Sequence, residues 1–282
     1  MSATRASRGR LAGAVLWSVQ PVAVAIAAPT VPPLLQATLA TTASLFLVWL
    51  WTRWRDIAVF AQDATLLPGV RLGLFFSARM ALLYVASARL GAVGAVEATA
   101  GVLLLLEQAR RRRSAQAAPA LLAVLALFVL GPRLSFAGGA LAALAALAWA
   151  AMEAVARDPR LQPCGGEKFV FYQLIGAAVT LPVASVVAGE NWLVTPSVAA
   201  WWALAAQVGA GVLALALLWI VPVAGARAQR LPTLLTVAPT AALVLDSLPG
   251  RLPPAACWVA AALLLAGARW PQRAAGLTPV SG

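Results

Sequence analysis

Long apolar runs separated by short polar or turn-forming segments make up most of this chain. The clearest run begins at Leu90 and ends in four arginines, Arg110 to Arg113, with one carboxylate, Glu97, inside it. An apolar run of about 18 residues or more can cross a bilayer as a helix. A basic cluster at its end is typical of a cytoplasmic anchor. The pattern therefore predicts a transmembrane helix that holds an acidic residue.

The same pattern recurs and predicts ten membrane-spanning helices, separated by turns such as Pro68-Gly69, Gly131-Pro132 and Pro249-Gly250. The expected spans are 11–28, 34–52, 70–88, 91–108, 117–131, 136–156, 169–188, 199–221, 233–248 and 254–270. The fifth and ninth are short for an upright helix. The fold class that follows is an all-α integral membrane protein.

Composition agrees with this class and narrows the function. The chain is 62% hydrophobic and only 11% charged, whereas soluble domains are about 45–50% apolar and about 25% charged. A net charge of +12 would suggest nucleic acid in a soluble protein. Here the arginines lie at the ends of spans, where topology explains them, so we expect a lipid bilayer as partner and no nucleic acid.

The residue inventory also argues against catalysis and metal binding. The chain has no histidine, and its two cysteines, Cys164 and Cys257, are far apart and outside any CxxC pair. Most nucleophilic triads, zinc sites and disulfide frameworks are thereby disfavoured. We expect no enzyme activity, no metal and no cofactor. No oligomeric state follows from the sequence.

Charge along the loops predicts the orientation. If the N-terminus is cytoplasmic and the loops alternate, only Arg89, Arg133 and Arg251 lie on the far side and Arg79 lies inside a span. This imbalance is the one that the positive-inside rule predicts for an even number of spans. The prediction is a multi-pass protein of the inner (plasma) membrane with cytoplasmic N- and C-termini, including tails at 1–9 and 272–282.

The two halves of the chain, 10–134 and 135–271, are expected to be five-helix repeats. Trp17, in Leu16-Trp17-Ser18, has a counterpart in Trp149, in Ala148-Trp149-Ala150. Because five crossings are an odd number, the second repeat must be inverted relative to the first. Inverted repeats place a binding site at the midplane between the halves.

These features resemble the drug/metabolite transporter superfamily in its ten-span EamA form, over about residues 10–270. Within this superfamily, the sequence most resembles the threonine/homoserine exporter type. The residues that carry the resemblance are Leu90-Gly91, Glu97, Thr99 and Ala100-Gly101 in the fourth span, Gly139 through Trp149-Ala150 in the sixth, and Pro239 in the ninth.

The chain also departs from the family pattern. Ala238 stands where a second glutamate often precedes the ninth-span proline, and Gly101 stands where the fourth-span motif has proline. The resemblance implies a secondary transporter that exports a small amphipathic metabolite, such as an amino acid, by alternating access, with proton coupling as an open option. The alternative is a divergent non-transporting membrane scaffold, or a lipid-acting membrane protein, on the same fold.

Two charges lie deepest in the predicted spans. Counted from the turn near Leu90, Arg79 is about ten residues down one helix and Glu97 about seven down the next. At about 1.5 Å per residue their depths differ by about 5 Å. The two charges form a structural ion pair, line a cavity site for a solute's charged groups and a proton, or extend to a membrane interface.

Other candidate binding residues are aromatic or polar. Trp17, Trp149 and Tyr84 lie near the ends of spans, as interfacial belt residues or as walls of a site. Gln20 and Gln207 bond either a neighbouring helix or a solute, and Thr99 is a candidate through the family motif. A transporter needs Glu97, Trp17 and Trp149 to face one common cavity, whereas a scaffold does not.

Overall fold

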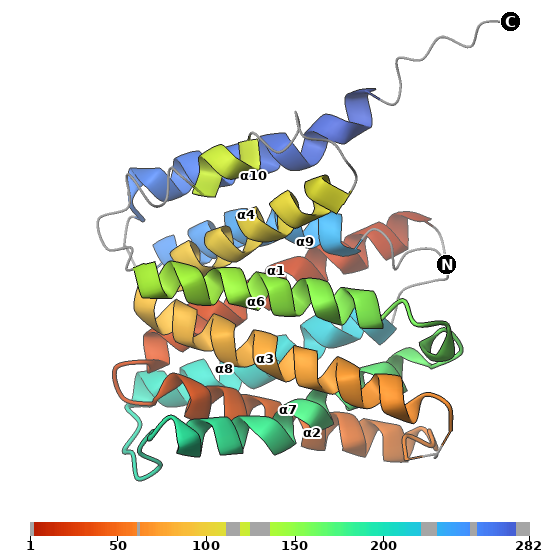
Figure 1. Ribbon diagram of the computed structural model, residues 1–282. Coiled ribbons are helices and arrows are strands. Elements are labelled where there is room, and N and C mark those ends of the chain that lie inside the picture. Colours follow the sequence, from red (N-terminus) through yellow and green to blue (C-terminus); the bar gives the residue numbers. More distant parts are fainter. Residues whose placement is uncertain are drawn as a thin grey trace, which may run out of the picture.

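The architecture is a bundle of long helices lying side by side (Figure 1). It is seen in a computed structural model that describes residues 3–60, 63–110, 119–124, 136–220, 230–248 and 253–274. Within these ranges the chain forms helices and their connections, and no β-strand.

The helices follow the predicted apolar runs closely, with small differences at their ends. They are α1 (Ala3–Ala27), α2 (Pro33–Trp54), α3 (Leu66–Leu90), α4 (Ala92–Arg110), α6 (Phe136–Val155), α7 (Gly166–Val187), α8 (Val198–Leu215), α9 (Arg230–Ser247) and α10 (Ala255–Ala274). A short 3-10 turn, η2 (Pro159–Leu161), precedes α7, and α8 continues into a π-helical turn, η3 (Ala216–Ile220).

Three predicted segments differ from the structure or lie partly outside the described residues. The tail predicted at 1–9 is helical from Ala3, because α1 extends beyond its apolar part. The fifth predicted span, 117–131, lies mostly outside the described residues, of which 119–124 are helical. Most of the C-terminal tail at 272–282 also lies outside them.

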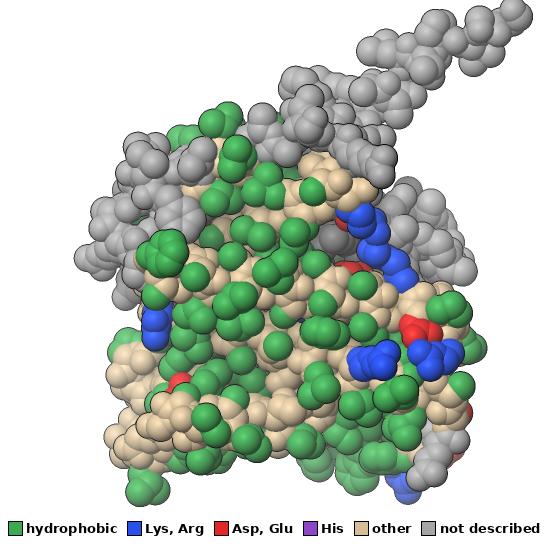
Figure 2. All heavy atoms as spheres, viewed as in Figure 1, with side chains coloured by type: hydrophobic (Ala, Val, Ile, Leu, Met, Phe, Trp, Pro, Cys, Tyr) green, Lys and Arg blue, Asp and Glu red, His purple; other side chains and the backbone are tan. Residues whose placement is uncertain are grey.

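Seven helices in the described part of the chain are long and apolar enough to cross a membrane, and two further apolar helices are shorter. The outer flank carries large exposed apolar side chains: on α7, Val179, Val183 and Val187 are 64%, 61% and 81% exposed. Figure 2 shows apolar side chains along the flank, with basic ones near the helix ends. A surface of this kind belongs in lipid. The protein is thus an all-α, multi-pass membrane protein.

The connection between α3 and α4 is a single residue. Helix α3 runs on through Leu90, and Gly91 then turns the chain with a positive φ of 78° before α4 begins at Ala92. Glycine adopts this conformation without a steric penalty. The short turn holds α3 and α4 as neighbours and so fixes the surroundings of Arg79 and Glu97.

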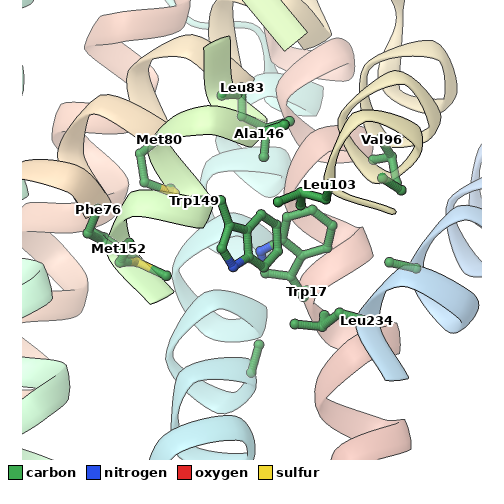
Figure 3. Packing of buried hydrophobic residues seen from close by; sticks show 14 of the residues in the cluster. Trp17, Phe76, Met80, Leu83, Val96, Leu103, Ala146, Trp149, Met152 and Leu234 are labelled. Carbon is green, nitrogen blue, oxygen red and sulfur yellow. The ribbon is translucent and has the colours of Figure 1, made fainter. Parts of the chain in front are cut away.

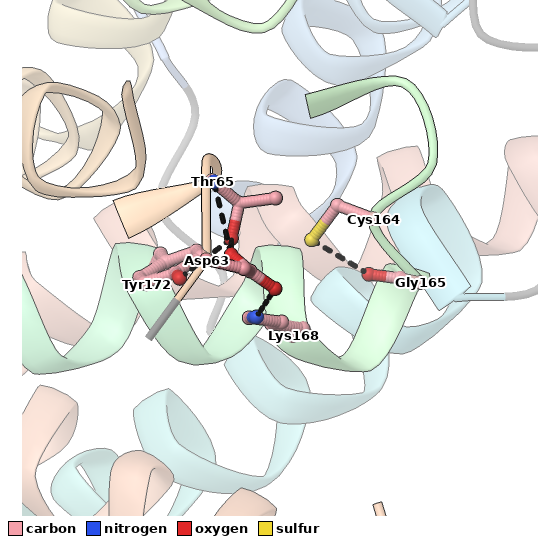
Figure 4. Close-up of polar contacts among 6 residues, drawn as sticks. All are labelled: Asp63, Thr65, Cys164, Gly165, Lys168 and Tyr172. Atoms are coloured by element: carbon pink, nitrogen blue, oxygen red, sulfur yellow. Dashed lines mark hydrogen bonds and ion pairs between the residues drawn. The ribbon is translucent and has the colours of Figure 1, made fainter. Parts of the chain in front are cut away.

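A polar cluster ties the loop before α3 to the start of α7 (Figure 4). Lys168 Nζ donates to Asp63 Oδ2 over 2.7 Å, and the backbone N–H of Thr65 donates to Asp63 Oδ1 over 2.9 Å. The Thr65 hydroxyl lies 2.8 Å from that of Tyr172. The cluster thus joins two elements about a hundred residues apart in the chain.

The helix pairs that pack most extensively bring together elements from both ends of the chain. Helix α1 packs on α8 and α9, α3 on α6 and α7, α2 on α7 and α8, and α4 on α6, α9 and α10. The interior of the bundle is therefore formed between early and late helices.

Candidate functional site

A small cavity lies among α1, α3, α6, α8 and α9, beside η3. Its volume is about 20 Å³, which is room for roughly one water molecule. The residues that line it are Trp17, Gln20, Phe76, Arg79, Trp149, Met152, Glu153, Gly211, Ala214, Leu215, Leu218, Trp219 and Leu234. The predicted candidates Trp17, Gln20, Arg79 and Trp149 thus meet at one place.

The two tryptophans form one wall of this cavity. Trp17 on α1 and Trp149 on α6 lie side by side in Figure 3, with ring centres 5.1 Å apart and planes inclined by 56°. Neither indole N–H has an acceptor. Both side chains are buried, at 5% and 3% exposure, so the interfacial-belt interpretation is wrong for this pair.

The alanine-rich sequence of α6 explains how a tryptophan fits here. Ala142, Ala145 and Ala146 are fully buried, and small side chains let neighbouring helices approach closely. Trp149 follows Ala145 by four residues, so it continues the same inward face of α6. Its ring therefore reaches α1 and α3 instead of the lipid.

Arg79 supplies the charge of the cavity. Its side chain is 4% exposed, and its guanidinium carbon lies 4.5 Å from the ring centre of Trp149 and 4.8 Å from that of Phe76. One terminal nitrogen donates to Met80 Sδ over 3.7 Å, a weak acceptor, while Nε has none. Stacking on two rings offsets part of the cost of burying a cation.

Glu153 is a lining residue that sequence reasoning did not select. It follows Trp149 by four residues on α6 and so shares its face, which was the signal available in the sequence. Its carboxylate acts on Arg79 electrostatically but is not within ion-pair distance of it. Gln20 of α1 also lines the cavity. Its amide packs against Gly211 of α8, where a side chain would leave no room for it.

Glu97 lies elsewhere. It is fully buried on α4, its carboxylate oxygens have no hydrogen-bond partner, and the Cys257 thiol of α10 is close enough to act on it electrostatically. It does not pair with Arg79 and does not line the cavity. Of the three residues that a transporter is expected to bring to one cavity, Trp17 and Trp149 meet there and Glu97 does not. Similar depth did not bring the charges together, because Arg79 turns toward α6 whereas Glu97 turns toward α10.

The remaining candidates lie outside the cavity, and two of them make hydrogen bonds between helices. Gln207 Nε2 donates to Gln36 Oε1 over 2.8 Å, which joins α8 to α2. The Thr99 hydroxyl donates to the Ala142 carbonyl of α6 over 3.4 Å. Tyr84 is buried with its hydroxyl unpaired, and it does not line the cavity. Within the described ranges, no three His, Cys, Asp or Glu side chains gather as a metal site requires.

Comparison with known proteins supports the fold and leaves the function open. No protein-family model matches the chain, and no curated protein matches it. A solved structure described only as the crystal structure of a protein superimposes with a TM-score of 0.69, covering 98% of this chain and 100% of that chain, at 21% sequence identity. At this identity the likeness shows a shared fold and carries no function with it.

Proposed function

We propose that the protein is a secondary transporter of the drug/metabolite type, which exports a small amphipathic metabolite, such as an amino acid, by alternating access. The observation that carries the proposal is the cavity where Trp17 of α1, Arg79 of α3 and Trp149 of α6 meet. A buried charge inside a membrane bundle is expensive and by default marks a functional site. Aromatic walls beside a charge suit a solute with both apolar and charged parts.

The pattern of helix pairing supports two inverted five-helix repeats. If each helix of one half corresponds to the helix numbered five higher or lower in the other half, α1 corresponds to α6 and α8 to α3. The pair α1 and α8 then corresponds to the pair α6 and α3, and both pairs pack closely. The pairs α2 with α7 and α4 with α9 map onto themselves in the same way, and both exist. This correspondence is expected when two halves of five spans are related by a twofold axis in the membrane plane. In a ten-span bundle of this type, the cavity lies between the halves.

Transport through this cavity requires that helices move. A volume of about 20 Å³ holds no metabolite, so the indoles of Trp17 and Trp149 must part as α1 and α6 separate. The π-helical turn η3 lies against the cavity through Leu218 and Trp219, and such turns occur often at functional sites. We propose that the halves rock about this region.

The first test is uptake of a labelled amino-acid panel into proteoliposomes. Trp149→Phe removes the indole N–H and part of the cavity wall, and we expect uptake to fall by about tenfold, equivalent to about 1.4 kcal/mol. Trp202→Phe is the matched control, because Trp202 is 74% exposed on the lipid-facing side of α8. Equal uptake by both variants, with equal folded yield, would contradict the assignment of this cavity as the transport site.

Glu97 supplies the test of proton coupling. Glu97→Gln keeps the size of the side chain and removes its charge. If Glu97 carries the proton, the variant loses the stimulation of uptake by an imposed pH gradient, while wild type keeps it. Stimulation that persists in the variant assigns Glu97 to structure and places coupling elsewhere.

A non-transporting scaffold is the second candidate. The small volume of the cavity and the position of Glu97 outside it favour this candidate. It predicts that a correctly folded, reconstituted protein moves no solute of the panel under any gradient.

A further inference from the structure

Three hydrogen-bond donors at the cavity are buried without an acceptor, and they identify the charge that the cavity selects. We propose that the cavity recognises the carboxylate of an apolar carboxylic acid, with Arg79 as the specificity-determining residue and the indole N–H groups of Trp17 and Trp149 as additional donors. The inference rests on the proposed function for its setting in transport. Because the cavity of about 20 Å³ is too small for such an acid, binding requires the separation of α1 and α6 proposed above. The recognition itself can still be tested by a binding measurement without transport.

Three buried donors at the cavity have no acceptor: Nε of Arg79 and Nε1 of both Trp17 and Trp149. A buried donor without a partner is destabilising, and a ligand or an ordered water molecule that enters the cavity can complete it. A water molecule offers two lone pairs, whereas a carboxylate offers about four. The carboxylate therefore matches the three donors better than water or a single hydroxyl does.

A cationic solute fits this site poorly. The guanidinium of Arg79 already lies over the rings of Trp149 and Phe76, so these aromatic faces hold a cation supplied by the protein. An ammonium group brought beside them would be repelled by Arg79 at short range. The planar guanidinium is also the side chain best suited to bind a carboxylate through two parallel hydrogen bonds.

Glu153 has a defined part in this arrangement. It is the acidic side chain in the described lining, and it acts on Arg79 without forming an ion pair. It balances the arginine from a distance and leaves the guanidinium nitrogens to a ligand. A bound carboxylate would be repelled by Glu153, so removal of that charge should strengthen binding. An ammonium ligand held by Glu153 would show the opposite change.

The rest of the lining determines the other part of the ligand. Phe76, Met152, Leu218 and Leu234 are apolar and surround the polar groups. A short hydrocarbon chain attached to the carboxylate is the chemistry that these surfaces would accept. Thioether and aromatic side chains also adapt readily to ligands of different shape.

Binding to the purified full-length protein in detergent tests the proposal by titration calorimetry with three probes that share one hydrocarbon chain. The probes are 4-methylpentanoate, its neutral amide 4-methylpentanamide, and the cation 3-methylbutylamine. We expect the carboxylate to bind about 10- to 100-fold more tightly than the amide, the range of a charge-assisted hydrogen bond, and the amine to bind most weakly. Equal affinities, preference for the amine, or no binding of any probe would overturn the proposal.

Variants then assign the charge recognition to Arg79. Arg79→Gln should lower carboxylate affinity by about 10- to 100-fold and remove the preference over the amide, and Arg79→Lys should recover only part of it. Arg89→Gln is the matched control, because Arg89 is an exposed arginine at the end of the same helix.

Glu153→Gln should raise carboxylate affinity. Loss of carboxylate binding in Glu153→Gln would show that Glu153 is needed for recognition and would refute the proposal.

The result separates from that of the transport assay. Arg79-dependent carboxylate binding without any uptake would keep the recognition site and refute the transporter. Uptake of amino acids by a protein that binds the carboxylate and its amide equally would keep the transporter and refute the recognition site.

Discussion

At the scale of the residue, the surroundings of a charge decide what it does. Arg79 is buried against aromatic rings beside a cavity, whereas Glu97 is buried at a similar depth without a hydrogen bond. Asp63 and Lys168 form an ion pair where a loop meets a helix start. Of these charged groups, Asp63 lies in a loop outside the spans. The contribution of its ion pair with Lys168 can therefore be tested by varying the pH of the solution.

The loop carboxylate gives a pH-dependent prediction. Hydrogen bonds from Lys168 and Thr65 lower the pKa of Asp63 from 3.8 to about 2. A carboxylate whose pKa is lowered on folding stabilises the folded state above its unfolded pKa, and this contribution is lost as the pH falls through the folded value. We expect Asp63→Asn to lower the unfolding temperature in detergent at pH 6 and to match wild type as the pH approaches 2.

The control for this prediction is Asp56→Asn. Asp56 is an exposed acid of the same loop with a positive φ of 52°, a conformation that asparagine also tolerates. Because it removes the same charge, it separates the ion pair from general electrostatics. If both variants lowered the unfolding temperature by the same amount at pH 6, the effect would come from the change in net charge and not from the ion pair.

At the scale of the element, glycines determine how closely two helices pack. On α3 and α7, Gly73 and Gly176 face each other so closely that a Cβ on Gly176 would lie 2.5 Å from the Gly73 Cα. A Cβ on Gly73 would lie 2.5 Å from the Tyr172 carbonyl oxygen. Backbone atoms cannot yield as a flexible side chain can, so any side chain here must push the helices apart.

This contact predicts that Gly176→Ala destabilises the protein. Overpacking of this kind usually costs about 1–3 kcal/mol, to be measured as a lower unfolding temperature or denaturant midpoint in detergent. Gly209→Ala on α8 is the matched control, because a Cβ there meets nothing within 4 Å. We expect it to be neutral or to stabilise by up to about 1 kcal/mol through helix propensity. Equal stability of the two variants would show that α3 and α7 separate at little cost.

Helix ends are also fixed by distant parts of the chain. Glu190, in the loop between α7 and α8, accepts hydrogen bonds from the backbone N–H groups of Leu34 and Leu35 over 2.9 and 2.7 Å. These groups belong to the first turn of α2, where a helix leaves its N–H groups unpaired and favours negative charge. Ser185 adds a hydrogen bond to the same carboxylate over 2.8 Å. One acid thus joins α2 to the end of α7.

At the scale of the whole molecule, the cavity lies where early and late helices meet, so motion between them would open it. Gly13 lies one turn before Trp17 on α1, and a Cβ at Gly13 would be 3.2 Å from the Leu217 Cβ of η3. Disulfides join Cβ atoms about 3.5–4.5 Å apart, so a small shift permits a bridge. A bridge here would hold α1 to η3 beside the cavity.

This geometry predicts that a reversible cross-link stops transport. In a background with Cys164→Ala and Cys257→Ala, which removes the two native cysteines, neither of which is in a disulfide, the pair Gly13→Cys and Leu217→Cys should lose uptake on oxidation and regain it on reduction. Gly13→Cys alone cannot form the bridge and should be insensitive to both treatments. Full uptake by the cross-linked protein would show that α1 and η3 stay together throughout the cycle.

The class of the protein and the approximate bounds of its helices can be predicted from the amino-acid sequence. Hydropathy is a local property, since a run of apolar residues long enough to span a bilayer forms a helix whatever surrounds it. The bounds of α2, Pro33–Trp54, accordingly differ little from the expected 34–52. The sequence also showed that Arg79 and Glu97 are charges inside apolar runs.

Which of these residues share a site depends on how the helices pack and could not be predicted from the sequence. Counting residues gives the depth of a side chain, but each residue also rotates the direction by about 100° around the helix, and the packing of neighbours fixes that direction. Arg79 therefore meets Trp149 and not Glu97. Glu153 joined the cavity for the same reason, since its position on the α6 face and the approach of α3 to that face decide what it lines.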